Sequence, residues 1–213
     1  MEHKIKLKKT YRYFTYGNPE TATNLWIVLH GYGQLAFYFL KKFNSLDPDK
    51  HFVVAPEGLH RFYIKGSSGR VGASWMTKES RLDDIEDNHR FLSTISRELT
   101  SGYTFKQKIL LGFSQGAATA SRWQDSSDYN ADILILWAGV FPPDLKFDPD
   151  RSGLSNSKNI FVLGKQDPYF ENQKNPFKEV DAHISSLFEI IHFDGGHDID
   201  SSVLKNISDR ISH

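Results

Sequence analysis

Short apolar runs alternate with longer segments of helical character along most of this chain. The runs have strand length and are rich in β-branched or aromatic residues; they lie at residues 11–16, 25–29, 51–55, 108–111, 133–137, 160–163 and 188–193. Several are continuous, which is typical of strands buried on both faces of a parallel sheet. Helices are predicted between or after them, at residues 34–42, 82–99, 115–123, 177–187 and 198–211. This order predicts an α/β fold, with a mostly parallel central sheet flanked by helices.

The segments between these elements carry no second core. Residues 57–74 are rich in glycine and are predicted to form a loop. Residues 138–159 contain proline and glycine, show little periodicity and are too short to form a cap domain. The chain has no internal repeat and no linker between domains. We therefore expect one α/β domain over residues 1–213, with an open site and no large lid.

Charge and composition narrow the classes of function. The chain has 26 basic and 26 acidic residues, and this balance gives no reason to expect a nucleic-acid partner. Lysines near the N-terminus alternate with Ile5 and Leu7, which favours the solvated face of an edge strand over a binding patch. There is no cysteine, which excludes disulfides, thiolate metal sites and a cysteine nucleophile. No stretch has the apolar length of a signal peptide or a membrane span, so the sequence predicts a cytoplasmic protein.

The segment Gly112-Phe113-Ser114-Gln115-Gly116 carries the strongest chemical signal. An apolar run precedes it and small residues follow it, which predicts a strand, a sharp turn and a helix. In such a nucleophile elbow the strained turn presents the serine hydroxyl, and the glycines let strand and helix approach closely. A glycine-rich turn with Ser114 as a helix N-cap is the plainer interpretation. We prefer the elbow because two partners for the serine follow in the required order.

Asp167 and His197 are those partners. Serine is a poor nucleophile unless a base takes its proton, and a third group must orient that base. Asp167 follows the predicted strand at 160–163, and His197 follows the last predicted strand in a loop with two glycines. The chain order of serine, acid and histidine is that of an α/β-hydrolase triad. Asp194 is the competing acid, although it lies close to the histidine in sequence.

An oxyanion intermediate requires two hydrogen-bond donors, and the sequence offers two backbone N–H groups. Gln115 follows the proposed nucleophile at a helix N-terminus, where the helix dipole also favours negative charge. Tyr32 lies in the loop His30-Gly31-Tyr32-Gly33 that ends a central strand, and we expect its N–H to be the second donor. His30 is expected to support this loop rather than act as a base.

With these motifs in place, the chain resembles the phospholipase/carboxylesterase group of the α/β-hydrolase superfamily, which includes acyl-protein thioesterase-like enzymes. The resemblance spans nearly the whole chain. It rests on the segments Leu29-His30-Gly31-Tyr32-Gly33, Gly112-Phe113-Ser114-Gln115-Gly116, Gly164-Lys165-Gln166-Asp167, Gly195-Gly196-His197-Asp198, Trp137-Ala138-Gly139-Val140-Phe141-Pro142 and Pro56 with Ser74-Trp75-Met76. The resemblance implies an α/β-hydrolase fold and a Ser-Asp-His triad.

The chain departs from the group's pattern at several positions near the expected pocket. Gln34 stands where an acidic residue is frequent, Ala138 where serine is common, and Tyr169-Phe170 where small aliphatic residues often follow the acid. These differences bear on substrate identity and not on mechanism. Aromatic and large apolar residues near the motifs are candidates for the pocket wall, namely Trp75, Met76, Phe141, Tyr169 and Phe170.

The sequence thus predicts a serine carboxylesterase that acts on small to medium esters through an acyl-enzyme. An acyl thioesterase, an acyl-protein deacylase or a lysophospholipase would use the same residues. A hydrolase-fold binding protein with weak catalysis is the alternative from a different class, and the complete triad argues against it. A peptidase is disfavoured because no extra domain would hold a peptide. We expect no metal, no cofactor and no nucleic-acid partner; a homodimer remains open.

Overall fold

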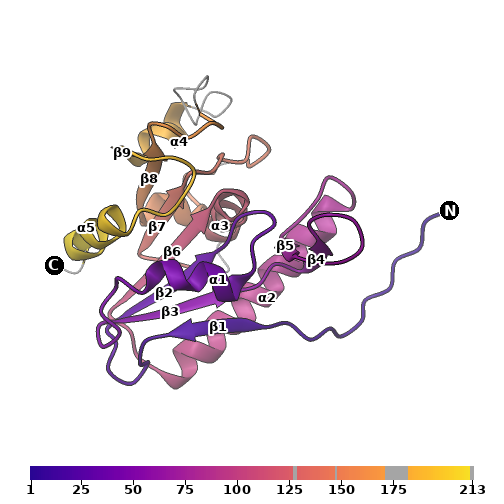
Figure 1. Ribbon diagram of the computed structural model, residues 1–213, viewed down its shortest axis with the longest axis horizontal. Coiled ribbons are helices and arrows are strands. Elements are labelled where there is room, and N and C mark those ends of the chain that lie inside the picture. The colour runs from indigo at the N-terminus through magenta and orange to yellow at the C-terminus, as the bar shows by residue number, and fades with distance from the viewer. Residues whose placement is uncertain (127–128, 147, 171–181, 212–213) are drawn as a thin grey trace.

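The computed structural model describes residues 1–126, 129–146, 148–170 and 182–211. Its centre is a seven-stranded sheet in the order β1-β3-β2-β6-β7-β8-β9 (Figure 1). The strands are β1 (Tyr13–Tyr16), β2 (Asn24–Leu29), β3 (His51–Pro56), β6 (Gln107–Phe113), β7 (Ile133–Trp137), β8 (Lys158–Gly164) and β9 (Phe188–Phe193). Only β1 runs antiparallel to its neighbour, so the predicted mostly parallel sheet is confirmed.

The strand order creates a switch point at the middle of the sheet. From β2 the chain moves outward to β3 on one side, and from β6 it moves outward through β7 and β8 to β9 on the other. Open α/β sheets bind ligands at the carboxyl ends of strands beside such a reversal. The fold therefore directs attention to the loops that follow β2 and β6.

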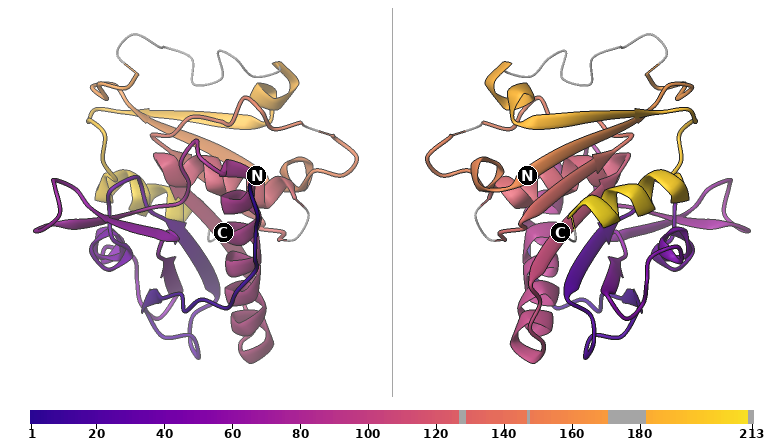
Figure 2. Two further views of the ribbon diagram at one scale, coloured as in Figure 1. Left: turned by 90° about the vertical axis from the view of Figure 1, so that its right-hand side faces the viewer. Right: turned by 90° about the vertical axis from the view of Figure 1, so that its left-hand side faces the viewer.

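Helices cover both faces of the sheet (Figure 2). On one face α2 (Arg81–Gly102) and α3 (Gln115–Asp125) pack against apolar side chains of the central strands. On the opposite face lie α1 (Ala36–Leu40) and α5 (Ser201–Ile211). The remaining helical elements are short, namely η1 (Lys41–Phe43), η2 (Gly153–Asn156) and α4 (Ala182–Ser186).

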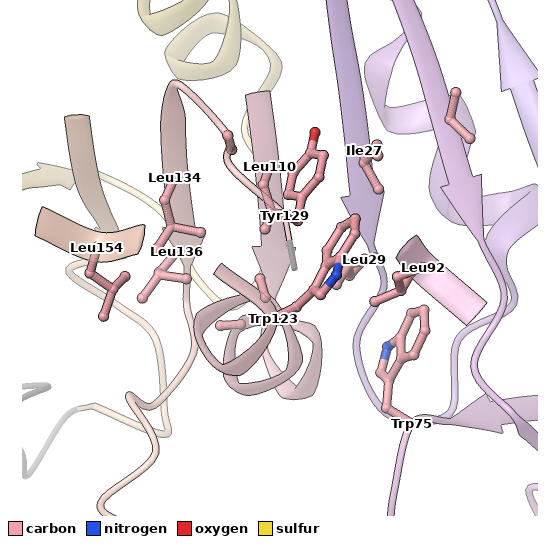
Figure 3. Close-up of a cluster of buried hydrophobic side chains, with 14 of the residues drawn as sticks. Ile27, Leu29, Trp75, Leu92, Leu110, Trp123, Tyr129, Leu134, Leu136 and Leu154 are labelled. Atoms are coloured by element: carbon pink, nitrogen blue, oxygen red, sulfur yellow. The ribbon is translucent and has the colours of Figure 1, made fainter. Parts of the chain in front are cut away.

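Successive strand residues feed the two faces in turn. In β2, Ile27 and Leu29 face the side of α2 and α3, whereas Trp26 and Val28 face the side of α1 and α5. Figure 3 shows the first of these two cores, in which Trp123 lies beneath the sheet. The indole of Trp123 stacks on the ring of Tyr129 at a centroid distance of 4.0 Å. Burial on both faces explains why the strands read as continuous apolar runs.

The predicted loop at residues 57–74 is in fact a β-hairpin, so that prediction was wrong. It consists of β4 (His60–Tyr63) and β5 (Val71–Ser74), which pair antiparallel outside the main sheet (Figure 1). β4 is only four residues long, and three of its four side chains are exposed, so it lacks the continuous apolar run of the buried strands. Two of the four glycines that suggested a loop, Gly66 and Gly69, lie in the connection between the two strands.

The edge strand predicted around Ile5 and Leu7 is absent, so that prediction was also wrong. Residues 1–12 form no strand. The Lys4 ammonium instead pairs with Asp83 of α2 at 2.6 Å. Ile5 and Leu7 remain about four-fifths exposed, at 82% and 81%, so the alternation buries neither of them. Without an apolar face to bury, the segment gains nothing by joining the sheet.

The helix predicted at residues 177–187 lies partly outside the described residues; the described part contains α4. Among the helices of the ranges given above, none combines the length and the apolar character needed to cross a bilayer.

Candidate active site

Ser114 occupies a strained turn between β6 and α3. Its backbone has φ +52° and ψ −116°, a conformation that residues other than glycine rarely adopt. The turn is tight enough to require the flanking glycines. A Cβ on Gly112 would lie 2.4 Å from the carbonyl oxygen of Gly116, and one on Gly116 would lie 2.3 Å from that of Leu29. The local backbone is therefore that of the elbow that the sequence predicts.

The structure brings Ser114, His197 and Asp167 into one hydrogen-bonded chain. Nε2 of His197 lies 3.0 Å from Oγ of Ser114, and its Nδ1 lies 2.7 Å from Oδ2 of Asp167. The carboxylate can only accept, so the neutral imidazole carries its proton on Nδ1 and accepts the serine O–H at Nε2. An imidazole held in this way can take the hydroxyl proton when the oxygen attacks an electrophile.

Asp167 is buried and fully engaged. Its side chain is almost completely shielded from solvent, and the backbone N–H of Tyr169 donates to Oδ1 at 3.0 Å. Asp194, the competing acid, is 79% exposed and pairs with the Lys165 ammonium at 2.8 Å. Asp167, and not Asp194, is therefore the carboxylate that contacts the imidazole of His197.

Several contacts that the sequence did not reveal hold the loop of His197. The indole N–H of Trp137, at the end of β7, donates to the carbonyl oxygen of Asp198 at 2.9 Å. The Asp198 carboxylate binds the Lys42 ammonium at 2.6 Å. The imidazole itself lies between two aromatic rings, with Phe113 at 5.0 Å and Tyr169 at 4.6 Å between centroids.

His30 supports the loop after β2, as the sequence predicts. The backbone N–H of Gly58 donates to its Nε2 at 2.9 Å, so Nδ1 carries the proton and donates to the carbonyl oxygen of Gly31 at 2.8 Å. Burial lowers the pKa of His30 to about 4, which keeps the imidazole neutral at physiological pH. Gln34 completes the loop, because its Oε1 accepts the N–H of Gly31 at 2.9 Å.

The two expected oxyanion donors are the backbone N–H groups of Gln115 and of Tyr32 in the loop after β2. Gln115 is the first residue of α3, so its backbone N–H has no acceptor within the helix. Across the part of the chain that the structure describes, the N–H of Tyr32 has no acceptor either. Both groups are thus available to a ligand.

The side chain of Gln115 plays a part that sequence reasoning missed. Its Oε1 accepts the backbone N–H of Trp75 at 3.1 Å, and its Nε2 donates to the carbonyl oxygen of Met76 at 2.8 Å. This amide joins the elbow to the segment that follows β5. An amide directly after the nucleophile was the only signal in the sequence for such a link.

The five residues predicted for the pocket wall fall into two groups. Trp75 and Phe141 are fully buried, and Met76 and Phe170 are nearly so. Trp75 donates its indole N–H to the carbonyl oxygen of His30 at 2.8 Å and thereby supports the loop after β2. Only Tyr169 is well exposed, at 72%, beside the imidazole of His197. Trp75, Phe141 and Phe170 belong to the core on the α2 and α3 side of the sheet. Tyr169 stays the leading pocket candidate, and the role of Met76 in the pocket stays a prediction.

Comparison with known proteins finds one matching family and several solved structures of similar fold. The family model for phospholipases and carboxylesterases matches residues 15–213. The chain is similar in structure to Zea mays acyl-protein thioesterase 2, with 17% identity and a TM-score of 0.70 over 94% of this chain and 97% of that one. It is also similar to the Bacillus cereus carboxylesterase, with 14% identity and a TM-score of 0.67 over 95% and 93%. A carboxylesterase from Mesorhizobium loti has 15% identity and a TM-score of 0.68 over 93% and 94%. No curated protein sequence matches the chain.

Proposed function

The chain belongs to the phospholipase/carboxylesterase family of α/β-hydrolases, and on that premise we propose that it is a serine carboxylesterase for small to medium esters. The observation that carries the proposal is the hydrogen-bonded chain from Asp167 through His197 to Ser114. A hydroxyl, an imidazole and a buried carboxylate in this order are the parts of a serine nucleophile with its base and its orienting acid.

In the proposed reaction Ser114 Oγ attacks the ester carbonyl carbon while Nε2 of His197 takes the hydroxyl proton. The C–O bond to the alcohol then breaks, and the imidazolium gives that proton to the departing oxygen. The resulting acyl-enzyme is hydrolysed by a water molecule that His197 activates in the same way. Asp167 keeps the imidazole in the required tautomer and stabilises its protonated form.

The negative charge on the carbonyl oxygen develops near the N-terminus of α3. We assign its two hydrogen bonds to the backbone N–H groups of Gln115 and Tyr32. Both are backbone donors fixed by surrounding contacts, so they need little reorganisation when the charge appears. Losing one such donor typically costs about 3–4 kcal/mol of transition-state stabilisation.

A fluorophosphonate probe tests the proposed nucleophile directly. The intact protein should gain the mass of one phosphonyl group, and peptide mapping should place it on Ser114. Ser68→Ala, in the connection between β4 and β5, is a matched control that should label normally. Labelling at another serine, or none on folded protein, would contradict the assignment.

The exposure of Tyr169 favours a second substrate class on the same residues. Among the described residues of the connection between β7 and β8, the only regular element is η2, so this connection contributes no helical cap. Tyr169 is exposed beside His197, and a large thioester or acyl-protein could approach from there. Comparing hydrolysis of a palmitoyl thioester with that of the matching oxygen ester would rank the two classes.

A further inference from the structure

A cleft of about 580 Å³ opens beside the loop that carries Tyr32. One side is formed by the start of this loop's helix, α1, and the other by the end of the β4–β5 hairpin. The lining residues are Gly33, Gln34, Leu35, Tyr38, Phe39, Lys42, Arg70 and Val71. Backbone hydrogen bonds of 2.9 Å between Gly33 and Ala73, and between Ala73 and Gln34, fix the two sides to each other.

The cleft connects to both proposed catalytic loops. Gly33, in its lining, follows Tyr32, which we assign as an oxyanion donor. Lys42, also in its lining, binds the carboxylate of Asp198, the residue after His197. Gln34, a third lining residue, accepts the N–H of Gly31 at 2.9 Å, and a Cβ on Gly31 would lie 3.1 Å from that of Ser114. The wall of the cleft thus adjoins the proposed nucleophile, which brings one arm of a bound ester within reach of the cleft.

The lining combines apolar surface with positive charge. Leu35, Phe39 and Val71 are apolar, whereas Lys42 and Arg70 are cationic, and no lining residue is acidic. Such a surface suits a short hydrocarbon part that ends in an anion.

Of the two cations that line the cleft, Arg70 is the one without an ion pair among the described residues. The carboxylates of the described residues form ion pairs with six other arginines, namely Arg12, Arg61, Arg81, Arg90, Arg122 and Arg210, whereas Arg97, outside the cleft, forms none there. Within the same described ranges the guanidinium of Arg70 forms no ion pair, and Lys42 is already bound to Asp198. A guanidinium offers a planar fork of donors that fits carboxylate and phosphate oxygens. The free anion-binding capacity of the cleft therefore lies on Arg70.

Resting on the proposed esterase function, we propose that this cleft binds a negatively charged group of the substrate, a carboxylate or a phosphate, through Arg70. Lys42 adds positive charge at the same surface while it holds the loop of His197. The preferred esters would then be anionic, with a short chain between the charged group and the scissile bond.

Matched ester pairs test this inference. On the acyl side, mono-4-nitrophenyl glutarate carries a carboxylate, and 4-nitrophenyl valerate is its neutral counterpart. On the alcohol side, 4-acetoxybenzoate and 4-acetoxyphenyl phosphate are compared with the neutral 4-acetoxybenzamide. The account predicts a lower KM for the anionic member of at least one pair, and the second set distinguishes carboxylate from phosphate.

Variants then assign the effect to one side chain. Arg70→Gln should raise the KM for the preferred anionic ester by about 5-fold and change the KM for the neutral ester by less than about 2-fold. Lys65→Gln removes a neighbouring charge that does not line the cleft, and it should leave both values unchanged. Arg70→Glu should reverse the preference.

The outcomes separate the two proposals. If neutral esters are hydrolysed but no anionic ester has a lower KM, or if Lys65→Gln matches the effect of Arg70→Gln, the cleft inference fails and the esterase stands. If no ester in either set is hydrolysed, the esterase proposal itself is overturned.

Discussion

Nε2 of His197 lies 3.0 Å from Oγ of Ser114, although 83 positions of sequence separate the two residues. Each is delivered by a strand of the same sheet, with Ser114 after β6 and His197 after β9. Two intervening strands, β7 and β8, set the distance between their loops. The loop of His197 reaches back to the elbow, and the contacts of Trp137 and Lys42 with Asp198 hold it there.

Asp167→Asn should lower kcat by about 10⁴-fold with little loss of stability. The amide can present an N–H to Nδ1 of His197, which favours the tautomer with its proton on Nε2, where the serine proton must go. Steady-state kinetics and a thermal melt measure the two quantities. Asp194→Asn is the matched control, because that exposed carboxylate pairs only with Lys165, and it should keep wild-type kcat. Equal losses in the two variants would contradict the assignment of the acid.

The stability of the protein should fall between pH 6.5 and pH 4 because of His30. Burial lowers its pKa from 6.5 to about 4 in the folded protein, so in this interval only the unfolded chain binds the proton. Stability therefore rises with pH through this window, by about 2–3 kcal/mol in all from this group. Burial also lowers the pKa of His51, which adds a change of the same sign.

Urea denaturation at four pH values across the window measures the overall change, and NMR titration of the histidine rings isolates His30. Its imidazole should remain neutral until pH falls to about 4. A His30 ring that titrates near pH 6.5 in the folded protein would contradict the neutral imidazole with two hydrogen bonds that is described for this loop.

Gln115→Ala should weaken both the elbow and the oxyanion site. The change leaves the N–H of Trp75 without its acceptor and removes one of two donors to the carbonyl oxygen of Met76, which also accepts the Ser74 hydroxyl; an unsatisfied buried group costs about 1–3 kcal/mol. The free energy of unfolding should fall by that amount, and kcat should fall further than KM rises. Gln166→Ala, at an exposed amide near the acid, serves as the control for urea denaturation and kinetics. A Gln115→Ala variant with wild-type stability and kcat would contradict the structural role assigned to this amide.

Gly116→Ala should prevent the elbow from forming, because the new Cβ would lie 2.3 Å from a backbone oxygen of β2. A rigid strand cannot move aside, so the protein should be insoluble or lose more than about 3 kcal/mol of stability. Gly102→Ala adds the same methyl group at the end of α2 with nothing within 4 Å, and helix propensity predicts a gain of at most about 1 kcal/mol. Similar melting temperatures for the two variants would contradict the close approach of strand and helix.

The sequence predicted those features that local signals determine. The elbow could be predicted because its glycines, its strand and its serine are contiguous. Asp167 and His197 could be placed because each lies in the loop directly after a predicted strand, β8 and β9 respectively. The choice of Asp167 over Asp194 rested on position alone until the structure placed one of them beside His197.

The features that escaped prediction depend on contacts between distant segments. β4 of the hairpin is short and mostly exposed, so it lacks a continuous apolar run of strand length. The cleft brings residues near Leu35 together with Arg70 only after folding. Trp75 was expected at a pocket wall because it is aromatic and close to a motif. Its burial and its bond to His30 follow from the packing of the hairpin against the oxyanion loop.

The measurement that tests the central claim most directly is hydrolysis of 4-nitrophenyl esters from acetate to laurate by the wild-type protein and by Ser114→Ala. The account predicts activity on at least the shorter esters and a loss of about 10⁴-fold or more in the variant, with an unchanged melting temperature. The chain-length optimum would then give the size of the acyl pocket. A folded Ser114→Ala variant that hydrolyses these esters at the wild-type rate would contradict the claim that Ser114 is the nucleophile.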